Sequence, residues 1–183
     1  MEGTDPDWIS FLISSQVITH DKMLENCEDN IEFFLRRISL MKDKLGVLLL
    51  QLPTLRTEHL ALLSNFLAIL PKDYRFSVEV RNKELLQHEL YSLLRNYNVA
   101  LAVAEHPFWA KHEIMTADFA YIRWEGDRRK VKGTMGQVEV NKTTNIAECA
   151  NKIKNLLDGQ IERAYYSGHP PTDAKQLLDI LSI

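Results

Sequence analysis

Short apolar runs alternate along the chain with longer segments whose apolar residues recur every three or four positions. The run GVLLLQLP, residues 46–53, is continuous and ends at a proline, which is typical of a strand buried on both faces. By the same pattern we predict strands at 8–14, 46–53, 75–81, 99–105, 119–125 and 160–166.

The segments between these runs have the apolar spacing of a single helix face. We predict helices at 31–45, 57–70, 82–94, 146–157 and 172–181. Thr57 and Asn82 are the predicted N-caps of the second and third helices. Gly159 suits the left-handed position that follows the fourth helix.

The alternation of strands and helices predicts the class of fold. Strands separated by helices pair in parallel through right-handed crossovers, so we expect an α/β fold over a single domain, residues 1–183. Periodicity does not choose between an open doubly wound sheet and a (β/α)8 barrel. The sequence contains neither GxGxxG after its first strand nor GxxxxGK[ST], so it lacks the usual nucleotide-binding motifs.

Composition changes this picture only slightly. Hydrophobic residues make up 45% of the 183 positions and charged residues 26%, with a formal net charge of −3. The acidic balance argues against a nucleic-acid partner. Cys27 and Cys149 have no metal-like spacing, so we expect buried free thiols and a cytoplasmic protein. We expect no membrane segment, because the apolar stretch near the N-terminus, residues 9–13, is too short to span a bilayer.

Polar residues follow every predicted strand. Because the carboxyl ends of parallel strands meet on one side, we expect these side chains to form a single rim, where sites of α/β proteins lie. The candidate catalytic residues are the carboxylates Glu79, Glu105 and Asp127. The candidate ligand-binding residues are Thr19, His20, Gln51, Arg81, Arg123, Trp124, Arg128, Tyr166 and His169.

Each of these residues also has a purely structural explanation. Glu79 and Arg81 are two positions apart, so they share a strand face and could form an internal ion pair. Gln51 could bond backbone groups in the core. The rim as a whole, rather than any one residue, favours a site. The sequence contains no HExxH, no GxSxG and no close His cluster, so we predict neither a metal nor a cofactor.

At these same positions the chain resembles the domain-of-unknown-function 72 family, or YecE-like proteins, from about Gln16 to Leu181. The resemblance consists of six blocks in order: QVITHDKML (16–24), DKLGVLLLQLP (43–53), FSVEVRN (76–82), VALAVAE (99–105), TADFAYIRWEGDR (116–128) and YYSGHPPTDAKQL (165–177). It implies a TIM-barrel-like fold with a pocket at the strand C-termini. It implies no established reaction.

The chain also departs from that family's pattern. The first two barrel strands have no counterpart before Trp8, so the resemblance implies an incomplete, N-terminally shortened barrel of about six parallel strands. Ile13 stands where the family has a lysine, and Arg163 and Ala164 stand where it has paired asparagines. The outermost strands would then be open edges, and we expect imperfect closure, cover from the N-terminal segment, or a homodimer through these edges.

Three functional hypotheses follow. The first is a small-molecule site for an anionic or phosphorylated ligand, contacted by Arg81, Arg123 and Arg128, with Glu79 or Glu105 as acid or base. The second is a metal-dependent phosphodiesterase or DNA-repair-like nuclease. The third is a degenerate, non-catalytic fragment. The sequence leaves open whether the protein is an enzyme.

Overall fold

The computed structural model describes residues 11–13, 17–52, 54–105, 114–124, 143–157, 161, 163–168 and 171–181. The strands are β1 (Phe11–Ile13), β2 (Val47–Gln51), β3 (Arg75–Glu79), β4 (Ala100–Leu101), β5 (Val103–Glu105), β6 (Phe119–Trp124) and β7 (Arg163–Gly168). The helices are α1 (Glu28–Ile38), α2 (Leu60–Ala68), α3 (His88–Asn96), α4 (Thr143–Leu157) and α5 (Pro171–Leu181).

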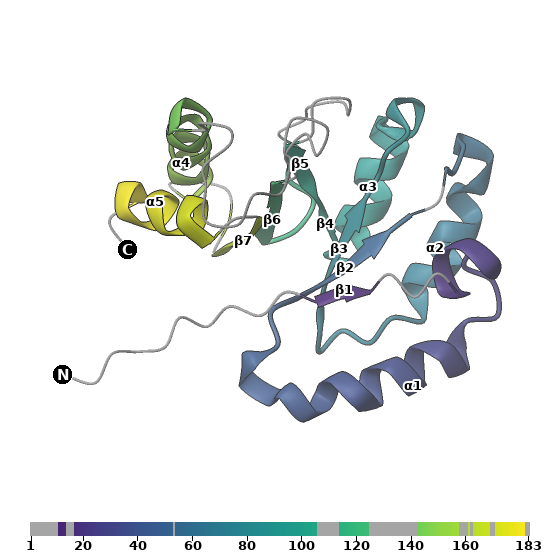
Figure 1. Cartoon of the computed structure of the whole chain (residues 1–183). Coiled ribbons are helices and arrows are strands. Elements are labelled where there is room, and N and C mark those ends of the chain that lie inside the picture. Colours follow the sequence, from purple (N-terminus) through teal and green to yellow (C-terminus); the bar gives the residue numbers. More distant parts are fainter. Residues whose placement is uncertain are drawn as a thin grey trace, which may run out of the picture.

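Every strand pairing in the described part of the chain is parallel. One sheet has the order β1-β2-β3-β4 and the other β5-β6-β7. Only Ala102 separates β4 from β5, and its N–H donates to the carbonyl of Val78 at 2.9 Å. The predicted fourth strand is therefore a single bent segment that joins both sheets into one curved surface (Figure 1).

Helices cover the outer face of this curved sheet. α1, α2 and α3 lie against the β1–β4 sheet, and α4 and α5 lie beside β5–β7 (Figure 1). The α/β prediction is confirmed, and the fold is an incomplete TIM-barrel-like one. Within the residues described, β1 and β7 each end a sheet and do not pair with each other. β1 and β7 are thus the outermost of the described strands.

Side-chain alternation along the strands divides the apolar core into inner and outer layers. The outer layer consists of two clusters, one around Leu48, Leu50 and Val78 with the first three helices and one around Ile122 with α4 and α5. The inner layer is a separate cluster that fills the barrel interior: Val47, Leu49, Ala100, Ala102, Phe119 and Tyr121. The face opposite the helices is therefore a packed interior for most of its height.

Two of the predicted helix starts were wrong. Thr57 lies inside a 3-10 turn over Thr57–His59, whose N-cap is Arg56, and α2 begins only at Leu60 with His59 as its N-cap. Asn82 does act as a cap, accepting from the N–H of Glu84 at 3.0 Å. It caps only a 3-10 turn, however, because Leu86 leaves the helical region with ψ 73°. α3 starts separately at His88.

The predicted end of the last strand was also wrong. β7 continues to Gly168 rather than stopping at Tyr166, because β6 offers pairing partners up to Trp124. Tyr165 consequently lies in mid-strand, in register with Tyr121. Its ring packs edge-on against Phe119 in the barrel interior, with centroids 5.9 Å apart. Gly159, the predicted helix terminator, lies outside the described residues.

Candidate functional site

A fully buried carboxylate, Glu79, forms the centre of the polar group at the strand ends. Its side chain has 0% exposure. Gln51 donates from Nε2 to Oε1 at 3.0 Å, and Arg123 donates from Nη1 to Oε2 at 2.5 Å. Arg81 Nε lies 3.6 Å from Oε1. Both carboxylate oxygens are thus engaged by side chains from β2, β6 and the end of β3.

Strand register brings these residues together. Gln51 and Glu79 are the last paired positions of β2 and β3, so they lie side by side on the inner face. The carbonyl of Glu79 also accepts from the N–H of Leu52 at 3.1 Å, which continues the pairing beyond the strand end. One layer below, Ser77 donates its hydroxyl to the carbonyl of Ala100 at 3.1 Å.

Arg123 must cross the β4–β5 segment to reach Glu79. On the inner face that segment presents Ala102, which is buried. Arg123 is in register with Ala104. An alanine side chain leaves room for the guanidinium to pass above it, whereas a branched residue would fill that space. The small residues in VALAVAE therefore leave room for this contact, whereas the sequence analysis drew only Glu105 of that segment into the site.

The charge at this site explains why so many donors converge. A buried carboxylate is costly unless ion pairs and hydrogen bonds replace its lost hydration. Two guanidinium groups, those of Arg81 and Arg123, lie beside this one carboxylate. Arg123 is 13% exposed, whereas Arg81 is 51% exposed. Of the two guanidinium groups, that of Arg81 is thus the more accessible from solvent.

The structure brings together four of the predicted site residues: Gln51, Glu79, Arg81 and Arg123. Thr19 and His20 lie on a π-helical turn over Val17–Asp21, where Thr19 is buried and His20 is exposed. The predicted ion pair of Glu79 with Arg81 is confirmed. The Gln51 side chain donates to the Glu79 side chain, whereas its structural explanation expected backbone partners.

Three other predicted site residues lie on β5, β6 and β7. Glu105 and Trp124 are register partners at the adjacent ends of β5 and β6, and Tyr166 pairs with Ile122 two positions before the end of β7. Only their backbone positions are described. Asp127, Arg128 and His169 lie outside the described residues.

The turn that follows β1 has a strained backbone that sequence analysis missed. Met23, Leu24 and Asn26 have φ values of 48°, 71° and 49°. Left-handed conformations of this kind are unfavourable for leucine and methionine and persist only where the surrounding structure holds them. Leu24 is buried in the core, and its N–H donates to the carbonyl of Ile18 at 2.9 Å. No glycine in the segment signalled this geometry.

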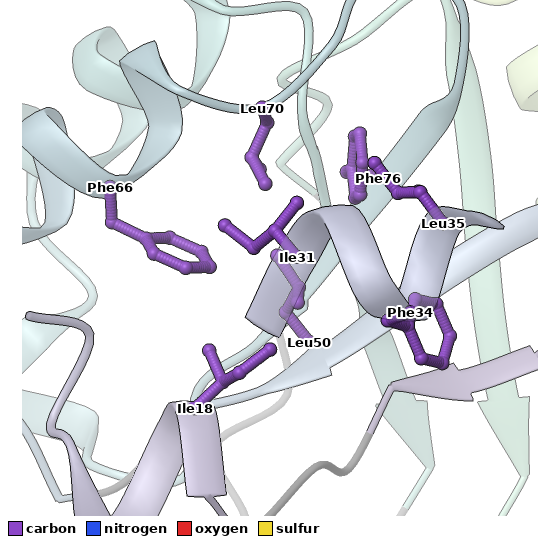
Figure 2. A pocket seen from close by; sticks show the side chains of 8 residues that line it. All are labelled: Ile18, Ile31, Phe34, Leu35, Leu50, Phe66, Leu70 and Phe76. Atoms are coloured by element: carbon purple, nitrogen blue, oxygen red, sulfur yellow. The ribbon is translucent and has the colours of Figure 1, made fainter. Parts of the chain in front are cut away.

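A small cavity lies on the other side of the sheet from Glu79. Figure 2 shows side chains from β2, β3, α1, α2 and the turn before α1 around it. Its lining is entirely apolar: Ile18, Ile31, Phe34, Leu35, Leu50, Phe66, Leu70 and Phe76. It is a packing defect of the outer core, with no polar group to orient a ligand.

In the described ranges, no three His, Cys, Asp or Glu side chains gather as a ligand set. Cys27 and Cys149 are buried free thiols, as predicted. No helix in the described part of the chain is long and apolar enough to cross a membrane.

Known proteins similar to this chain share one family. Residues 2–183 match the model of the family described as "Protein of unknown function DUF72". A crystal structure of a DUF72 family protein from Thermotoga maritima is similar, with a TM-score of 0.73 and 19% identity over 94% of this chain and 72% of the other. One from Enterococcus faecalis has a TM-score of 0.69 and 16% identity over 93% and 70%. No curated protein matches the chain. At these identities the structural likeness concerns the fold.

Proposed function

The chain belongs to the DUF72 family of proteins of unknown function, and we propose that its strand C-termini bind a small anionic or phosphorylated ligand. The observation that supports this proposal most strongly is the group of two arginines around the buried Glu79. Guanidinium groups held in place by a carboxylate are pre-organised for a second, bidentate anion.

In this proposal the two arginines have different tasks. Arg123 is nearly buried and bonded to Glu79, so it fixes the electrostatic potential of the site. Arg81 is half exposed and lies farther from the carboxylate, so it contacts the ligand. Glu79 serves as a positioning residue, because both of its oxygens already accept from neighbouring side chains. Glu105 and Asp127 remain the predicted general acid or base of the site.

Binding measurements on arginine variants test this proposal. We expect Arg81→Ala to weaken binding of phosphate monoesters by about tenfold or more, as expected for one lost charge-assisted contact. Arg75→Ala is the matched control, since Arg75 is an exposed arginine at the opposite end of the same strand. Calorimetry and ligand-induced thermal shifts would report both. Equal affinities of the wild-type protein and Arg81→Ala, or equal losses in both variants, would remove the basis of the proposal.

The other hypotheses make different predictions in the same experiments. A metal-dependent nuclease would bind divalent cations and cleave an abasic-site duplex, and no described ligand cluster favours it. A degenerate fragment would show no ligand-dependent thermal shift. The network around Glu79 argues against degeneracy, since an unselected site would not retain a costly buried carboxylate with all its partners.

We further propose that residues 1–183 form one domain, and the buried cysteines Cys27 and Cys149, which form no disulfide, support a cytoplasmic location in a reducing compartment.

A further inference from the structure

Helix α1 carries large apolar side chains on its solvent side. Phe33 is 57% exposed, and Leu40, on the 3-10 turn Ser39–Lys44 that continues α1, is 82% exposed. The Arg37 guanidinium lies over the Phe33 ring, 4.5 Å from its centroid. Phe33, Arg37 and Leu40 follow helical spacing, so they form a continuous stripe. Single exposed hydrophobic residues are ordinary on protein surfaces. This stripe indicates an interface only in combination with the charged residues around it.

The charges of α1 are segregated along its length. Glu28, Asp29 and Glu32 occupy the first half, Arg36 and Arg37 the second, and all five side chains are exposed. The helix dipole accounts in part for this order, since acids stabilise a helix start and bases its end. It does not account for the exposed Phe33 and Leu40. If a second copy of α1 lay antiparallel to the first, the acidic half of each helix would lie beside the basic half of the other, with the exposed apolar side chains between them.

We propose that the exposed face of α1 binds α1 of a second copy of this chain, antiparallel and about a twofold axis near Phe33. In this arrangement the two Phe33 rings meet at the centre. Asp29 of each copy faces the Arg37 side chain of the other, because an isologous interface brings each surface against itself. The Glu32–Arg36 ion pair within each helix, at 2.8 Å, lies beside the apolar centre. Opposite charges then surround an apolar centre, as in other protein interfaces.

The position of α1 permits such an association. α1 runs along the outer rim of the molecule, with the sheet on its inner side (Figure 1). Glu79 lies on the opposite, inner face of the sheet, so the dimer would leave the proposed ligand site accessible. A helix of 11 residues is only about 16 Å long, and its face is smaller than a standard interface. The dimer should therefore be weak, with a Kd of roughly micromolar order, and sensitive to salt.

Charge reversal provides a specific test of the antiparallel arrangement. Asp29→Lys/Glu32→Lys leaves only basic side chains at positions 29, 32, 36 and 37, and Arg36→Glu/Arg37→Glu leaves only acidic ones at these positions. Sedimentation velocity from about 5 to about 300 µM should show about tenfold weaker self-association for each variant. An equimolar mixture of the two should form a heterodimer at least as stable as the wild-type dimer. Absence of heterodimer in the mixture would overturn the proposal.

A second pair of variants guards against loss of folding in the charge variants. Phe33→Ser/Leu40→Ser changes only exposed side chains and should abolish dimerisation without lowering the melting temperature. Ile69→Ser is the matched control, because Ile69 is an exposed apolar residue on a different element, and it should leave the dimer intact. A wild-type protein that stays monomeric at about 300 µM would contradict the proposal. So would a dimer insensitive to Phe33→Ser/Leu40→Ser, which would instead indicate the open edges of β1 and β7.

Discussion

Arg123 reaches from β6 across the β4–β5 segment and places its Nη1 2.5 Å from Oε2 of Glu79 on β3. This contact joins the two sheets through side chains, as the bent β4–β5 segment joins them through the backbone. The contact lies near the C-terminal ends of the strands, where the pairing between them stops. The stability of the fold and the geometry of the proposed site should therefore depend on the same pair.

Arg123→Met should destabilise the protein by about 3–5 kcal/mol, because Glu79 would keep a buried charge without its nearest cation. The double variant Glu79→Leu/Arg123→Met should be less destabilised than Arg123→Met alone, since it removes the buried charge as well. Urea unfolding of the single and double variants measures this coupling. Additive effects would show that the two side chains do not stabilise each other.

Ala102→Leu should destabilise the protein by about 1–3 kcal/mol, because a larger side chain would overpack the inner core beneath Arg123. Binding of the anionic ligand should weaken at the same time, as Arg123 is displaced. Ala61→Leu on the exposed side of α2 is the control and should change stability by less than about 0.5 kcal/mol. A fully stable Ala102→Leu protein with unchanged affinity would refute the crossing geometry.

Thr116→Val should destabilise the protein by about 1–3 kcal/mol, because the Thr116 hydroxyl connects two backbone groups at the start of β4. Its Oγ1 accepts from the N–H of Leu101 at 2.8 Å and donates to the carbonyl of Val99 at 2.7 Å, and the residue is buried. Valine has the same shape and satisfies neither group. Chemical denaturation measures the loss, and Thr57→Val at an exposed position should have little effect.

Stability should fall above neutral pH through Cys27. Burial raises the pKa of the Cys27 thiol, an effect that the nearby Lys22 partly offsets. The thiol therefore stabilises the fold fully below its unfolded pKa of about 8.5, and this contribution is lost as pH rises through the folded pKa. The stability difference between the wild-type protein and Cys27→Ala should shrink as the pH rises above about 8.5. A difference that stays constant or grows would contradict this account.

Much of the fold followed from local patterns in the sequence. The buried run of β2 was predicted because four consecutive apolar residues, Val47 to Leu50, suit a strand covered on both faces, and all four are buried. The ends of elements were less predictable. β7 extends to Gly168 because β6 pairs with it there, and the helix start expected at Asn82 gave way to a 3-10 turn. Such boundaries depend on partners distant in the chain.

The sequence by itself determined which residues could form a site, because parallel strands place their C-terminal residues on one side and Gln51, Glu79, Arg81 and Arg123 occupy those positions. Only the tertiary structure decided which arginine pairs closely with Glu79 and which one stays exposed to solvent. Burial and distance are properties of packing between strands far apart in sequence, and they make Arg123 the fixed partner of Glu79 while leaving Arg81 half exposed.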